Sequence, residues 1–147
     1  MYAARFNDRI GFYLEEMFET FRFDYKLYNT ETELVNRIIK TFNHTKGNFG
    51  VIFNGIKGTG KTVTSKQICN GLCLPVIIIE RGMIGIETHV NRIKQDLIVF
   101  VDEYEKIYTD SHQMLTIMDG AVNSEFRRFF MLTTNNLHIN ENLRQRP

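Results

Sequence analysis

The residues best suited to chemistry lie in a glycine- and lysine-rich stretch, GIKGTGKT, at positions 55–62. This stretch fills every fixed position of the phosphate-binding pattern G-x-x-x-x-G-K-[ST]. Glycines permit positive φ, so successive backbone N–H groups can turn toward phosphate oxygens. Lys61 offers a compact charge to the β- and γ-phosphates, and the hydroxyl of Thr62 can join the ligands of a Mg²⁺ ion. We therefore expect a nucleoside triphosphate to be bound by Gly55, Lys57, Gly58, Thr59, Gly60, Lys61, Thr62 and Val63.

An acidic pair, Asp102 and Glu103, directly follows five apolar residues at positions 97–101. Acidic side chains at the carboxyl end of a buried strand would face the crevice where open α/β sheets bind ligands. Asp102 is suited to hold Mg²⁺, directly or through water, and Glu103 is suited to orient and deprotonate an attacking water molecule. The alternative is a charged pair that only ends a strand at the surface.

The apolar pattern around these residues predicts the elements that must hold them. Four apolar runs have the length of strands and no polar alternation, which is typical of strands covered on both faces of a parallel sheet. These runs lie at 50–53, 75–79, 97–101 and 129–132, and helical segments are expected at 34–42, 61–71, 87–95 and 111–119. The alternation of strands and helices predicts right-handed βαβ units, an α/β fold and a mainly parallel sheet.

The first 30 residues are expected to form an N-terminal helical extension, ahead of a core that spans residues 31–147. Within the extension, apolar side chains recur at steps of three and four residues over positions 5–22, as in an amphipathic helix. They are Phe6, Ile10, Tyr13, Leu14, Met17, Phe18 and Phe21. This apolar face either packs against the core or docks on a neighbouring subunit.

Composition narrows the class of protein. The chain has 147 residues, of which 43% are hydrophobic, enough for one packed domain. A net charge of +1 provides no broad basic field, which argues against a nucleic-acid partner. No run of 18 apolar residues indicates a membrane span, and no signal peptide is evident. Cys69 and Cys73 are expected to be buried free thiols in a reducing compartment, which predicts a cytoplasmic protein.

Four motifs together resemble the AAA family of ATPases over about residues 30–147. They are GIKGTGKT at 55–62, LIVFVDE at 97–103, QMLTIMDG at 113–120 and MLTTNN at 131–136. The resemblance implies a P-loop NTPase fold with three α/β/α layers. It also implies Mg²⁺-dependent hydrolysis of ATP to ADP and a homo-oligomeric ring, with a hexamer as the expected form. Because the family continues into a fifth strand and a helical lid, we expect the sequence to be a fragment of a longer protein.

The resemblance also assigns roles to individual residues. Asn135 matches the family's sensor 1, the asparagine that positions water against the γ-phosphate; the alternative is a turn residue that ends a strand. Arg146 falls at the spacing of an arginine finger that reaches into the next subunit's site, or it is a solvated terminal arginine. The stretch Met83-Ile84-Gly85 lies where the family has a pore loop that contacts a polypeptide, and a plain connecting loop is the alternative.

Departures from the family pattern leave three functional hypotheses open. Ile56 and Lys57 replace prolines that many family loops carry, which leaves the loop less stiff. The leading hypothesis is a ring ATPase that moves or remodels a protein client that the sequence does not identify. A nucleic-acid motor or helicase loader of the same superfamily is the first alternative, and a nucleotide-gated assembly scaffold is the second.

Overall fold

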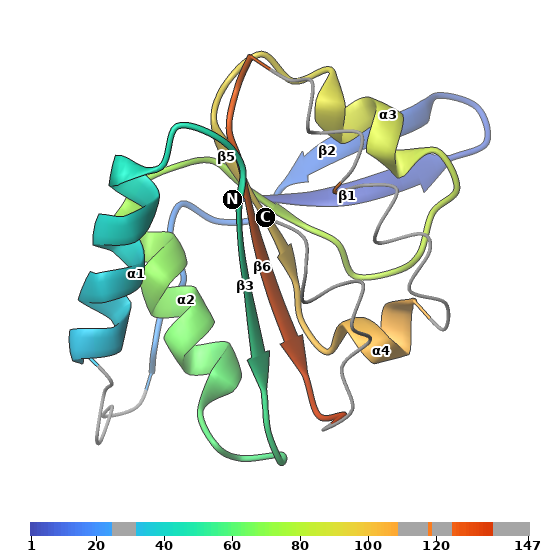
Figure 1. Ribbon diagram of the computed structural model, residues 1–147. Helices are drawn as coiled ribbons and strands as arrows, with labels where there is room; N and C mark the ends of the chain where they lie inside the picture. The colour runs from blue at the N-terminus through green and yellow to red at the C-terminus, as the bar shows by residue number, and fades with distance from the viewer. Residues whose placement is uncertain (25–31, 109–117, 119–124, 137–147) are drawn as a thin grey trace.

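A computed structural model describes residues 1–24, 32–108, 118 and 125–136. The described residues form one sheet with helices on its faces (Figure 1). The elements in chain order are β1 (Tyr2–Asn7), β2 (Gly11–Glu16), α1 (Thr32–His44), β3 (Phe49–Asn54), α2 (Lys61–Leu72), β4 (Val76–Ile78), α3 (Ile86–Asn91), β5 (Leu97–Val101), α4 (Tyr104–Ile107) and β6 (Arg128–Thr134).

The sheet has the strand order β2-β1-β4-β5-β6-β3. Every neighbouring pair is parallel except β1 and β2, which form an antiparallel hairpin at one edge. Strand β6 lies between β3 and β5, so these three strands carry their carboxyl ends to the same side of the sheet, near α4 (Figure 1). The predicted mainly parallel α/β fold is confirmed.

Two apolar clusters on opposite faces of the sheet explain why the central strands read as continuous apolar runs. In β5, Leu97, Val99 and Val101 belong to one cluster, and Ile98 and Phe100 belong to the other. Successive strand side chains point to opposite faces, so a strand covered on both faces needs an apolar residue at every position. One face is covered by α1 and α2, which lie side by side, and the other by α3 (Figure 1).

The helix predicted for positions 5–22 is wrong: the segment forms the β1–β2 hairpin and then an irregular stretch. A turn over residues 8–10 reverses the chain, the side chain of Asn7 accepts the N–H of Arg9, and Gly11 takes a φ of 76°. Strand β1 also pairs with β4, far along the sequence. This tertiary pairing outweighed a helical spacing that a short apolar segment can show by coincidence.

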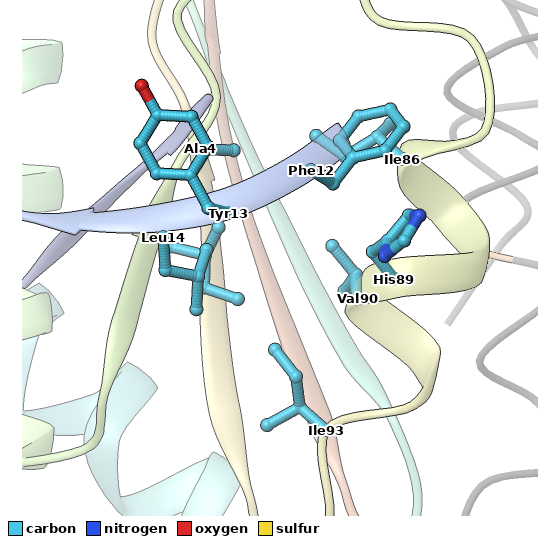
Figure 2. Close-up of a pocket in the computed structure, with 9 residues that line it drawn as sticks. Ala4, Phe12, Tyr13, Leu14, Ile86, His89, Val90 and Ile93 are labelled. Carbon is cyan, nitrogen blue, oxygen red and sulfur yellow. The ribbon is translucent and has the colours of Figure 1, made fainter. Parts of the chain in front are cut away.

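The hairpin leaves a hollow of about 160 Å³ between β2 and α3. Figure 2 shows Phe12 of β2 beside Ile86 and His89 of α3, and Tyr13 and Leu14 of β2 also line the hollow. The rings of Phe12 and His89 are 4.3 Å apart, centre to centre, and Phe12 also meets Phe6 edge-on. The hairpin is therefore part of the six-stranded sheet, and its side chains pack on α3.

Smaller differences concern the ends of the helices. Helix α3 ends at Asn91, earlier than the predicted 95, and the predicted helix at 111–119 lies outside the described residues except for the buried Met118.

Cys69 is buried in α2, but Cys73 is exposed, so the prediction of two buried thiols is wrong for Cys73. The helix ends at Leu72, and Cys73 caps it in the left-handed conformation, with its side chain in solvent. The boundary predicted between residues 30 and 31 lies outside the described residues.

A buried arginine fixes the amino end of β6. The side chain of Arg128 is fully buried, and its guanidinium donates to the carbonyl oxygens of Gln95 at 2.7 Å and Ile93 at 2.6 Å. Burial lowers the pKa of Arg128, and nearby Asp96 opposes that change.

The helices of the described residues fall short of a membrane span, because none of them reaches both the length and the hydropathy that such a span requires.

Candidate functional site

The phosphate-loop sequence connects the end of β3 to the start of α2, as predicted. Gly58 and Gly60 adopt φ values of 87° and 85°, which residues with a side chain rarely tolerate. Helix α2 begins at Lys61 and is 12 residues long, so its first backbone N–H groups point into the loop. The N–H groups of Lys61, Thr62 and Val63 precede the first hydrogen bond of the helix, which Thr64 donates to Gly60, and such groups can attract an anion.

The ammonium of Lys61 joins the loop to the neighbouring strand β6. Its Nζ atom donates to the carbonyl oxygens of Gly55 at 2.8 Å and Ile56 at 2.9 Å. It also donates to the side-chain oxygen of Asn135 at 3.0 Å. Asn135 directly follows β6, whose last residue pairs with the last residue of β3, so the register of the sheet brings these two side chains together.

The hydroxyl of Thr62 meets the carboxylate of Asp102, the first residue after β5. Thr62 Oγ1 donates to Asp102 Oδ1 at 2.9 Å. A hydroxyl and a carboxylate are the hard oxygen donors that Mg²⁺ prefers. The chemistry of the pair therefore fits the predicted metal ligands, and the structure brings them together.

The carboxylate of Glu103 is the second acidic group of the site. Its Oε2 atom forms an ion pair with the ammonium of Lys106, and its Oε1 atom accepts a hydrogen bond from the amide nitrogen of Asn135 at 2.6 Å. These bonds, that to Lys106 first, lower the pKa of Glu103 below its ordinary value. The carboxylate is thus ionised at neutral pH and can accept a proton.

Most of these groups line a hollow of about 300 Å³ at the carboxyl ends of the strands. Asp102 is not part of the lining and meets the site through its bond with Thr62. The lining holds most of the predicted site residues together with one that was not predicted, Thr133: Lys57, Gly58, Gly60, Lys61, Thr62, Val63, Glu103, Thr133 and Asn135. Of the other predicted residues, Gly55 accepts the bond from Lys61, and Thr59 Oγ1 donates to the carbonyl of Ile56 at 3.0 Å. Arg146 lies outside the described residues. The candidate pore-loop residue Ile84 is 92% exposed, and Met83 packs on the core.

Three polar residues of the site were missed by sequence reasoning. Thr133 donates to Asp102 Oδ1 at 2.5 Å, and Glu105 accepts the backbone N–H of Asn135 at 2.8 Å. Lys106 pairs with Glu103 as described above. The only signal in the sequence was position, because Thr133 lies near the end of a predicted strand and Glu105 and Lys106 closely follow the acidic pair.

The fold and the hollow together define a nucleotide-binding α/β protein of the P-loop class. A sequence profile of the family described as "ATPase family associated with various cellular activities (AAA)" matches residues 51–146. The chain therefore belongs to the AAA family, and the resemblance read from its motifs is confirmed. Members of this family generally bind and hydrolyse ATP with Mg²⁺. A comparison with curated protein sequences found no match.

Solved structures support the fold. PCH-2 of C. elegans superposes with a TM-score of 0.57 at 13% identity, over 80% of this chain and 41% of that one. The Holliday junction branch migration motor RuvB of Thermotoga maritima gives 0.53 at 17% identity, over 80% and 43%. A mutant of the same RuvB gives 0.52 at 17%, over 79% and 41%. The chain thus spans less than half the length of these proteins, and at such identities the likeness concerns the fold alone.

Proposed function

We propose that this chain binds ATP with Mg²⁺ and hydrolyses it at the carboxyl ends of β3, β5 and β6. The observation that carries the proposal is the chain of hydrogen bonds from Lys61 through Asn135 to Glu103. It joins the phosphate loop to Glu103, and all three side chains line one hollow. Catalysis of phosphoryl transfer depends mainly on placing such charges around the phosphate, so this arrangement suits it.

The phosphates of ATP sit on the loop and on the first turn of α2. Backbone N–H groups at positions 58–62 donate to the phosphate oxygens, and the helix dipole adds to the attraction. The ammonium of Lys61 exchanges its carbonyl acceptors, on Gly55 and Ile56, for phosphate oxygens. This exchange needs only movement of a side chain, because the ammonium already lies over the loop.

Thr62 and Asp102 would hold the magnesium ion. When bound, Mg²⁺ neutralises the negative charge that develops on the phosphoryl oxygens. Both residues would supply oxygen ligands, and the 2.9 Å bond between their side chains supports this assignment. The carboxylate of Asp102 also compensates part of the charge of the ion.

Glu103 accepts a proton from the attacking water, and Asn135 orients that water. The lowered pKa of Glu103 keeps its carboxylate ionised at neutral pH, which is the protonation state from which it can accept a proton. A positioned base of this kind contributes about 10²–10⁴-fold to the rate. The amide of Asn135 contacts both Lys61 and Glu103, so it lies between the phosphate side and the water side of the hollow.

The finer proposal is that ATP hydrolysis moves or remodels a protein client in a ring of identical subunits, expected to be a hexamer. Family membership supports it. In such a ring Arg146 of one subunit would reach the site of the next, and an arginine supplied in this way is worth about 10³–10⁵-fold in rate. Movement of the subunit interface would then carry the work.

Replacing Glu103 by glutamine in the intact protein tests the proposal. Glu103→Gln keeps the shape but cannot accept the proton, so we expect ATP binding to persist and phosphate release to fall by about 10²–10⁴-fold. Glu16→Gln, on the exposed strand β2, is the matched control and should hydrolyse ATP at the wild-type rate. Wild-type turnover by Glu103→Gln would contradict the assigned base. If assembly and biological output survive without turnover, a nucleotide-gated scaffold replaces the motor.

A further inference from the structure

The side chain of Thr133 lies between the two acidic residues of the site. Thr133 is fully buried near the end of β6 and also lines the hollow. Its hydroxyl donates to Asp102 Oδ1 at 2.5 Å and accepts the backbone N–H of Glu103 at 2.8 Å. Resting on the function proposed above, we propose that Thr133 is a positioning residue that sets the orientation of both acidic groups for ATP hydrolysis.

The first effect concerns the metal ligand Asp102. Its Oδ1 atom accepts from Thr133 and, at 2.9 Å, from Thr62, so two hydroxyls on different elements hold the same oxygen. Two bonds to one oxygen fix the rotation of a carboxylate. The Oδ2 atom of Asp102 receives no hydrogen bond from the described residues, so this second oxygen is not held by a donor of its own. Without the hydroxyl of Thr133, Thr62 would be the one remaining side chain among the described residues that donates to this carboxylate.

The second effect concerns the backbone of Glu103. This residue has a φ of 51°, a left-handed conformation that residues with a side chain seldom adopt. Its N–H group points to Thr133, so this hydrogen bond helps hold the strained turn between β5 and α4. This turn directs the side chain of Glu103 toward Asn135, whose Nδ2 atom lies 2.6 Å from Glu103 Oε1. One hydroxyl therefore orients the base and the metal ligand together.

The neighbouring Thr134 shows that burial alone does not create this role. Thr134 is equally buried, but its hydroxyl accepts the N–H of Asn136 at 3.0 Å and does not line the hollow. If Thr133 served only the packing of β6, replacing either threonine by valine would have the same kind of effect. The pair thus provides a control within one strand.

The test compares Thr133→Val, Thr133→Ser and Thr134→Val in the intact protein. Valine keeps the shape of Thr133 and removes the hydroxyl, whereas serine keeps the hydroxyl. Misplacing catalytic groups by about 1 Å costs about 100-fold, so we expect kcat of Thr133→Val to fall by that order and KM to change little. Serine should restore most of kcat, and Thr134→Val should retain it.

A binding measurement separates positioning from packing without relying on turnover. Calorimetric titration with ADP should give Thr133→Val the wild-type affinity in EDTA, and a smaller gain in affinity than wild type when Mg²⁺ is added. If the valine variant does not fold, Thr133→Ala replaces it in both assays.

The two proposals fail in different ways. A wild-type protein that binds no nucleotide overturns the proposed function. If wild type binds and hydrolyses ATP, this inference is overturned by wild-type kcat and wild-type Mg²⁺ dependence in Thr133→Val, by equal losses in Thr133→Val and Thr134→Val, or by no rescue with serine.

Discussion

The carboxyl ends of β3, β5 and β6 and the β1–β2 hairpin belong to one sheet but differ in chemistry. At the carboxyl ends, charged and amide side chains contact one another around a hollow, as in the bonds from Lys61 to Asn135 and from Asn135 to Glu103. At the hairpin, large apolar side chains remain partly exposed, among them Ile10 at 69% and Leu14 at 44%. Changes at the first region should therefore alter nucleotide chemistry, and changes at the second should alter stability.

Within this comparison, the larger effect is expected for Asn135→Ala, at the carboxyl ends of the strands. Removing an oriented amide that serves the transition state costs about 10²–10³-fold in other enzymes, so turnover should fall by about 100-fold while the melting temperature stays close to that of wild type. The variant also loses a hydrogen bond that lowers the pKa of Glu103. That pKa should rise, so the acid side of the pH–rate profile should move to higher pH.

The control for this variant is Asn36→Ala, on the exposed face of α1. It should change neither turnover nor the pH profile. A large loss of stability in Asn135→Ala, with normal turnover per folded molecule, would mean that the site region is structural and would remove the contrast between the two regions.

A smaller effect is expected for Gly11→Ala. The sign of its change in the free energy of unfolding distinguishes a hairpin from a helix. Gly11 has a φ of 76°, which costs an L-residue about 1–2 kcal/mol, so the hairpin predicts a loss of that size in the free energy of unfolding. A helix over the same residues would instead gain about 1 kcal/mol from alanine. Denaturant unfolding measures the difference, and nucleotide affinity should not change.

Gly47→Ala is the matched control for Gly11→Ala. Gly47 has no positive φ, and an added Cβ would meet no atom within 4 Å. Alanine there should be neutral or stabilise the protein by about 0.4–1 kcal/mol, because it reduces the freedom of the unfolded chain. Stabilisation by both substitutions would contradict the hairpin.

The contrast between the carboxyl ends of the strands and the hairpin also explains which parts of the structure could be predicted from the sequence. The central strands were predictable because burial on both faces requires apolar residues at every position, as in β5. Most of the site was predictable because the phosphate loop is continuous in sequence and because Asp102 and Glu103 follow a strand directly. Parallel strands then bring these groups to one edge without further information.

The hairpin and Thr133 could not be read in the same way. A short segment such as 5–22 fits both helical and strand spacing. Pairing with β4, some 70 positions away, is what makes its first part a strand. The role of Thr133 depends on the register between β5 and β6, in which Val101 pairs with Leu132. That register places Thr133 beside Asp102, and it is set by packing of the sheet rather than by a local pattern.

The most direct test of the account is calorimetric titration of ATP with Mg²⁺ into the intact wild-type protein and into Lys61→Ala. Lys61 contacts the loop and Asn135, so its loss should weaken ATP binding by about 100-fold or more without lowering the melting temperature. Lys40→Ala, on the exposed face of α1, should bind ATP as wild type does. Saturable binding by wild type and by Lys40→Ala, together with its loss in Lys61→Ala, is the predicted result. Equal binding by Lys61→Ala, or none by wild type, would contradict a nucleotide site at the carboxyl ends of these strands.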